Sequence, residues 1–246
     1  MFSTFFRAAA FAGALLWVGG SQASIVLNTT RVIYNGADKE ASFGVLNSGN
    51  AEILLQTWLE SGADSNTQAR PPFAVTPALT RMPGNGRQLL RLIYAGSGLP
   101  QDRESVFWLN VQEIPQAAAE NTLQIAVRQR IKVFFRPKSL SGDAQDAPQA
   151  LQWRLSGSDA VLVENPGPYH VSMIRIAARQ ANTELAREDA RMIAPGETVR
   201  LTLSRKAGSG PVTLSFNSIN DFGGQVAYRA TLKPGVSTVA RRADPE

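Results

Sequence analysis

Residues 121–137, NTLQIAVRQRIKVFFRP, constrain the fold more than any other segment of the chain. Successive side chains of a β-strand point to opposite faces, so a period of two over this length predicts a strand. At about 3.3 Å per residue the strand would be roughly 50 Å long, far beyond the usual length. We expect that it bends between sheets or leaves one end free to pair with another chain. The apolar positions are Leu123, Ile125, Val127, Ile131, Val133 and Phe135, and the opposite parity carries Arg128, Arg130, Lys132 and Arg136.

The N-terminus predicts a secretory signal peptide at residues 1–23. Arg7 precedes an apolar run over residues 8–18, and small residues before Ser24 indicate cleavage after Ala23. A membrane anchor is the alternative, but the apolar run is about half of the roughly 20 residues that a membrane-spanning helix needs. We therefore expect an exported protein.

Composition excludes several classes of function. The net charge of +5 is scattered rather than gathered into a Lys/Arg tract, which disfavours nucleic-acid binding. The chain has no cysteine and one histidine, so Cys–His nucleophiles and zinc sites with several Cys/His ligands are excluded. The Gly-x-Gly fragments at 84–86 and 208–210 do not open a helix after a strand, and no Walker or nucleophile-elbow motif is present. We expect no enzyme, cofactor, metal or small-molecule substrate.

Short β-rich runs separated by turn residues predict an all-β protein of two antiparallel sandwiches. The first domain should span 24–138, the segment 139–148 reads as a linker, the second domain should span 149–240, and 241–246 reads as a disordered tail. The best helical candidate is the short polar segment 182–191. The expected strands are 31–34, 41–45, 53–59, 73–75, 88–93 and 106–114, then 151–155, 160–163, 170–177, 192–193, 198–203, 212–216 and 226–232.

Five ordered segments carry a resemblance to a known family. They are TRVIYNG at 30–36, QTW at 56–58, LPQDRESVFWLNVQEIP at 99–115, IKVFFRP at 131–137 and NDFGG at 220–224. Together they resemble the periplasmic pilus-assembly chaperones of the chaperone–usher pathway, over residues 24–232. The resemblance implies two immunoglobulin-like sandwiches set at an angle, with a cleft between them. The short segment between Pro115 and Leu123 resembles the short-connection subclass.

The resemblance also implies a mechanism. A pilus subunit lacks the last strand of its own sheet, and the chaperone lends a strand to the exposed groove until an outer-membrane usher receives the subunit. The residues that match the donor strand are Leu123, Ile125 and Val127. The alternative is that these side chains face the core of their own domain. An exposed donor edge also implies self-association of the free chaperone.

Two sets of charged residues match family features. Arg31 and Lys132 match the cleft cations that grip the C-terminal carboxylate of a subunit, which would set the register of strand pairing. Glu104, Arg136 and Asp221 match a salt-bridge network at the domain interface. Such a network is physically reasonable, because one guanidinium can bind two carboxylates. The alternative for each is a solvated surface charge.

Two other protein classes remain open from the residues alone. A periplasmic immunoglobulin-like adhesive or carbohydrate-binding module would need an aromatic platform on its surface. A pilus subunit would be a single incomplete sandwich, which conflicts with the length of the chain and the Arg31/Lys132 pair. His170 follows Pro168-Tyr169 near an expected strand start, and we expect a structural or surface role for it.

Overall fold

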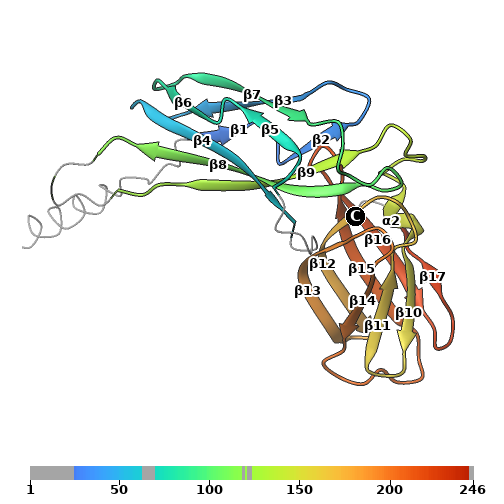
Figure 1. Ribbon diagram of the computed structural model, residues 1–246. Coiled ribbons are helices and arrows are strands. Elements are labelled where there is room, and N and C mark those ends of the chain that lie inside the picture. The colour runs from blue at the N-terminus through green and yellow to red at the C-terminus, as the bar shows by residue number, and fades with distance from the viewer. Residues whose placement is uncertain (1–24, 63–69, 118–119, 121–123, 244–246) are drawn as a thin grey trace, which may run out of the picture.

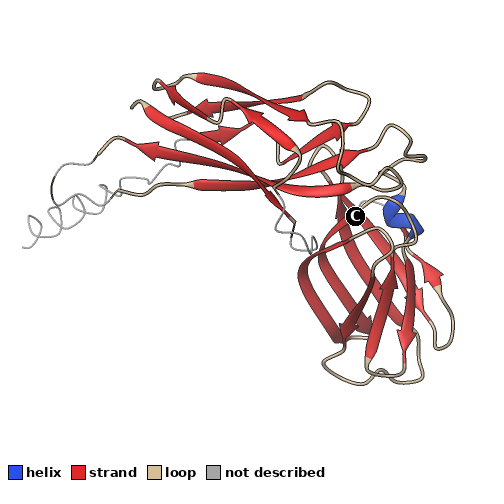
Figure 2. Cartoon of the chain, in the orientation of Figure 1, coloured by secondary structure: helices blue, strands red, loops and turns tan. Residues whose placement is uncertain are grey.

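Two immunoglobulin-like β-sandwiches, joined at an angle, make up the computed structural model (Figures 1 and 2), which describes residues 25–62, 70–117, 120 and 124–243. The expected signal peptide at 1–23 lies outside these residues. Within the described part of the chain, no helix is long and apolar enough to cross a membrane.

The first domain packs two sheets face to face. One has the order β1-β3-β7-β5 and the other β2-β9-β8-β4-β6. Alternate side chains of both sheets fill the core, where Leu55, Leu90 and Leu109 are fully buried. The strands are β1 (Ile25–Leu27), β2 (Arg31–Asn35), β3 (Ala41–Asn47), β4 (Ile53–Ser61), β5 (Phe73–Thr76), β6 (Leu79–Met82), β7 (Arg87–Tyr94), β8 (Ser105–Pro115) and β9 (Arg128–Arg136).

Strand β9 lies between β2 and β8, and this position decides which of its faces points into the core. It pairs with β8 antiparallel and with β2 parallel, in a register that sets Arg31 opposite Lys132. Val133 and Phe135 point into the core, with at most 2% of their surface exposed. Lys132 and Arg136 have the opposite parity, so they lie on the outer face of the sheet.

The prediction of one strand through 121–137 was wrong at its N-terminal part. Residues 124–127 have no regular secondary structure, and 121–123 lie outside the described residues. The ladder to β8 ends at the pair Gln112–Arg128, with one more hydrogen bond from Glu113 N to Val127 O at 3.1 Å. Strand β2 reaches only as far as Lys132. Strand β8 itself continues to Pro115, but residues 124–127 form no ladder with it.

The second domain is built in the same way. Its sheets have the orders β14-β11-β10-β17 and β13-β12-β15-β16-β18. An aromatic cluster fills the core: Trp153 lies 5.4 Å from Phe216, which stacks on Tyr228 at 5.3 Å between ring centroids. The strands are β10 (Gln152–Ser156), β11 (Ala160–Glu164), β12 (Val171–Gln180), β13 (Thr183–Ile193), β14 (Thr198–Thr202), β15 (Val212–Ile219), β16 (Gln225–Leu232), β17 (Thr238–Val239) and β18 (Arg241–Arg242).

Three segments in the second half of the chain have more structure than their local sequence indicated. The helical candidate 182–191 is strand β13, because its backbone pairs with β12 along nearly its whole length. The expected linker runs into a short helix, α2 (Ala147–Ala150), and its Leu140 packs against the second core. The expected disordered tail begins with β18, which pairs with β16. For β13 and β18 a tertiary partner overrides a weak local signal.

Leu109→Ala tests the first core. Leu109 has 0% of its surface exposed in the middle of β8, so we expect a loss of about 2–5 kcal/mol in the free energy of unfolding by urea. The matched control Leu79→Ala removes a leucine that is 57% exposed and should cost less than about 1 kcal/mol. Equal losses would contradict the assigned core.

Candidate functional site

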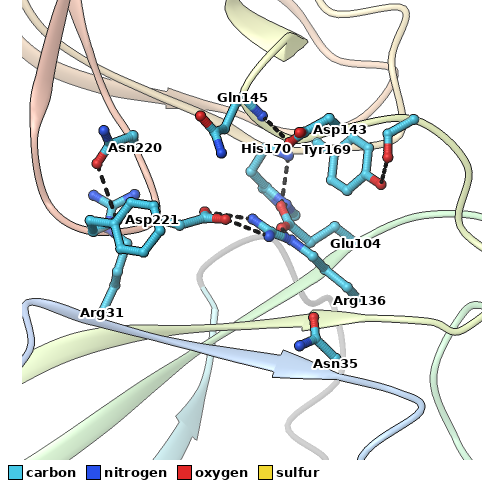
Figure 3. A network of polar contacts seen from close by, with 12 residues as sticks. Arg31, Asn35, Glu104, Arg136, Asp143, Gln145, Tyr169, His170, Asn220 and Asp221 are labelled. Carbon is cyan, nitrogen blue, oxygen red and sulfur yellow. Dashed lines mark hydrogen bonds and ion pairs between the residues drawn. The ribbon is translucent and has the colours of Figure 1, made fainter.

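The charged residues singled out in the sequence gather where β2 and β9 of the first domain meet the β15–β16 loop of the second. Figure 3 shows Asp221 between Arg31 and Arg136, with Glu104 and His170 on the far side of Arg136. The β-strand register explains half of this arrangement, since Arg31, Lys132 and Arg136 share the outer face of adjacent strands. The loop from the second domain supplies the rest.

Arg136 joins the two domains through both of its polar edges. Its Nε donates to Glu104 Oε1 at 2.8 Å, while its Nη1 and Nη2 donate to the two carboxylate oxygens of Asp221 at 2.6 and 2.7 Å. Burial by itself lowers the pKa of Arg136, but the hydrogen bonds and charges of Asp221 and Glu104 more than offset this and raise that pKa above its ordinary value. The guanidinium is therefore held permanently charged between two carboxylates.

Glu104 extends this network to a residue that the sequence did not assign to it. Its side chain is 1% exposed, and its Oε2 accepts a hydrogen bond from His170 N at 2.8 Å and lies 2.9 Å from His170 Nδ1. The Glu104 backbone N also donates to Pro168 O at 2.9 Å. His170 is thus a buried interface residue, as a structural role implies. Its place just before β12 was the only signal in the sequence.

Arg31 is largely withdrawn from water. It is 9% exposed, its Nη1 donates to Ile219 O at 3.1 Å, and its guanidinium lies 5.5 Å from the centroid of the Phe134 ring. Its Nε is buried with no hydrogen-bond partner among the described residues. Burial lowers the pKa of Arg31, the nearby carboxylates of Asp221 and Glu104 raise it, and Arg136 lowers it further. A buried donor without a partner favours binding of an acceptor.

Lys132 lies beside Arg31 on the neighbouring strand. Its Nζ is 5.5 Å from the centroid of the Trp108 ring, and its pKa is lowered by burial and then by the charge of Arg31. Within the described residues, no carboxylate forms an ion pair with Arg31 or Lys132. Two desolvated cations side by side destabilise each other, and an anion bound between them would remove that cost.

A row of arginines over tryptophans continues along the outer face of β9, and the sequence reading missed it. The Arg130 guanidinium lies 4.2 Å from the centroid of the Trp108 ring, and the Arg128 guanidinium lies 5.9 Å from that of Trp58. Arg130 also forms an ion pair with Glu60 at 3.3 Å. The pairing of β9 with β8, and of β8 with β4, brings these side chains together, so the alternation of β9 alone could not reveal them.

The structure describes two of the three residues expected to form the donor strand. Ile125 is 57% exposed, so it does not face the core of its own domain. Val127 is half-buried at the start of the sheet, and Leu123 lies outside the described residues. The segment that precedes β9 therefore presents an apolar side chain to solvent, beyond the last paired residue of the sheet.

The fold defines a protein of two immunoglobulin-like domains with a charge network between them. Residues 24–141 match the N-terminal domain family described as pili and flagellar-assembly chaperone, PapD N-terminal domain. Residues 146–230 match pili assembly chaperone PapD, C-terminal domain. The chain belongs to the PapD family of pilus-assembly chaperones.

Relatives of known name agree with this assignment. The chain is 39% identical to the probable fimbrial chaperone YadV of Escherichia coli (strain K12), covering 90% of this chain and 95% of that protein. It is 37% identical to the chaperone protein LpfB of Salmonella typhimurium, covering 85% and 89%. These names favour a chaperone over an adhesive or carbohydrate-binding module.

Solved structures give the same result. The crystal structure of the YadV chaperone matches with a TM-score of 0.74 and 37% identity, covering 85% of this chain and all of that one. The SafB chaperone in complex with the SafA pilin of Salmonella enterica matches with a TM-score of 0.72 and 25% identity, covering 87% of this chain and 99% of that one.

Arg136→Ala tests the interdomain network. Removal of the guanidinium leaves the buried Glu104 carboxylate without its cation, so we expect a loss of about 3–5 kcal/mol in the free energy of unfolding and a broader distribution of domain angles in solution scattering. Arg200→Ala is the matched control, because Arg200 pairs with Asp159 at 2.7 Å in an exposed position, where an ion pair is worth less than about 1 kcal/mol. An unchanged scattering profile for Arg136→Ala would contradict a role in domain orientation.

Proposed function

We propose that this protein is a periplasmic chaperone that binds and folds pilus subunits by donor-strand complementation and delivers them to an outer-membrane usher. The observation that carries the proposal is the pair Arg31 and Lys132: a buried arginine and a half-buried lysine on adjacent strands, with no ion-pair partner in the described part of the chain. Lys132 lies on β9, and the segment that precedes β9 presents the exposed Ile125. Family membership supports the same function.

The cation pair has the properties of an anchor for a subunit's C-terminal carboxylate. An anion held by two charge-assisted donors is fixed in position as well as bound. Backbone pairing along a strand is otherwise tolerant of a slip, and a slip by one residue would turn every side chain to the wrong face. A carboxylate fixed at Arg31 and Lys132 would therefore set which subunit pockets meet which chaperone side chains.

The donor segment would fill the groove that the subunit leaves open. Residues 124–127 would pair with the subunit through backbone hydrogen bonds, and Leu123, Ile125 and Val127 would enter the groove from one parity. Burial of each side chain is worth about 1.5–3 kcal/mol. Release needs no nucleotide, because a subunit's own extension can replace the chaperone strand by exchange.

Further parts of the proposal follow from the sequence. The N-terminal segment 1–23 acts as a cleavable signal peptide that exports the chain to the periplasm. The domains comprise residues 24–138 and 149–240, and Glu104, Arg136 and Asp221 fix the angle between them. The chaperone performs no enzymatic reaction, and its free donor segment promotes self-association.

Ile125→Asp tests the donor segment. A carboxylate cannot enter an apolar groove without a large desolvation cost, so we expect a pilus subunit encoded beside this chaperone to lose co-purification from the periplasm. Ala126→Asp is the matched control, because it adds the same charge at an exposed position of the opposite parity and should keep the complex. If both variants retain the subunit, the donor assignment is wrong.

Lys132→Met tests the anchor and its energetic cost. Because the pKa of Lys132 is lowered in the folded chain, its charge destabilises the fold at every pH below that pKa, and this cost disappears as the pH rises through it toward the ordinary value of 10.5. We expect the variant to match or exceed the melting temperature of the parent at pH 7, with the gain shrinking in alkaline buffer.

The same variant should lose subunit binding by at least about tenfold, because one of two charge-assisted donors is gone. Lys132→Arg, which keeps the charge, is the control and should retain most of the binding. Full binding by Lys132→Met, with normal circular dichroism, would refute the anchor.

A further inference from the structure

Phe222 occupies an unusual position at the tip of the loop between β15 and β16. It is 88% exposed, more than any other large apolar side chain among the described residues. Turn tips favour Gly, Asn, Asp and Ser, and this loop has the sequence Asn220-Asp221-Phe222-Gly223-Gly224. The phenyl ring makes no contribution to either core, so packing within the free chain does not account for it.

The loop that carries Phe222 is held rigidly. Asn220 Oδ1 accepts hydrogen bonds from the backbone N of Phe222 at 3.1 Å and of Gly224 at 2.8 Å. Asp221 is fixed by its two hydrogen bonds to Arg136. Gly223 has φ +83°, and a Cβ there would lie 2.5 Å from Thr30 Oγ1, so only glycine allows the loop to approach the first domain this closely. The loop is therefore already ordered in the free chain, so binding of a ligand costs little further conformational entropy.

The same contacts place the loop beside the proposed carboxylate anchor. On one side of Phe222, Ile219 O accepts the hydrogen bond from Arg31 Nη1. On the other side, Gly223 abuts Thr30, the residue that precedes Arg31. An exposed aromatic ring on a rigid loop, continuous with a charged anchor, has the character of an interaction hot spot, because aromatic anchors bury much area at little entropic cost.

We propose that Phe222 binds the apolar or aromatic side chain of the residue that carries a bound subunit's C-terminal carboxylate. The inference rests on the proposed function, since it assumes that the carboxylate lies at Arg31 and Lys132. The second domain then takes a direct part in recognition. The first domain binds the carboxylate, and Phe222 in the loop of the second domain contacts the side chain of the same residue. Chains that end in glycine or a polar residue are then bound less tightly.

Short synthetic peptides of alternating threonine and valine test the proposal with the full mature chaperone. One peptide ends in phenylalanine and one in glycine, and each is made both as the free acid and as the C-terminal amide. Affinities are measured by calorimetry for the parent protein, Phe222→Ser and Phe222→Trp. Val236→Ser is the matched control, because Val236 is 53% exposed beyond the opposite end of β16.

The parent should bind the phenylalanine acid about tenfold more tightly than the glycine acid. Phe222→Ser should abolish this preference while it keeps the preference for acid over amide, and Phe222→Trp and Val236→Ser should keep both. A preference for phenylalanine that survives in Phe222→Ser would overturn the inference. Equal binding of acid and amide by the parent would instead overturn the carboxylate anchor and with it the proposed function.

Discussion

The shared guanidinium of Arg136 is the interaction on which the rest of the structure depends. It links Glu104 of the first domain to Asp221 of the second, with three hydrogen bonds of 2.6–2.8 Å. Because Asp221 lies in the β15–β16 loop, this link also brings the Ile219 carbonyl to Arg31 and the exposed Phe222 to the edge of the proposed anchor. A buried charge with two partners tolerates little displacement, so we propose that this link fixes the angle between the sandwiches.

The two faces of strand β9 contact different parts of the molecule. Its core face, with Val133 and Phe135, joins the two sheets of the first domain. Its outer face carries Lys132 beside Arg31 of β2 and Arg136 toward Asp221 of the second domain. Burial and the charge of Arg31 lower the pKa of Lys132, so keeping both cations charged on adjacent strands costs stability. The anion site that we propose would offset this cost.

Much of the fold was predictable because its signal is local. A period of two predicted a strand, and the structure has strand β9 over residues 128–136. The signal failed where no local pattern exists: the polar segment 183–193 gave no clear alternation, and only pairing with β12 makes it a strand. Residues 124–127 show the reverse case, since their alternation is clear but they form no regular strand in the structure.

The candidate site, like the fold, was predictable from the sequence only where the signal is local. The sequence by itself determined which side chains carry charge and which apolar residues share a face, because strand geometry converts spacing into orientation. Only the tertiary structure decided that Arg31 lies opposite Lys132, that Glu104 also binds His170, and that the loop with Phe222 closes on Thr30. These contacts join residues up to about 190 positions apart. Their geometry depends on the parallel pairing of β2 with β9 and on the docking of two domains, and neither leaves a periodic trace in the chain.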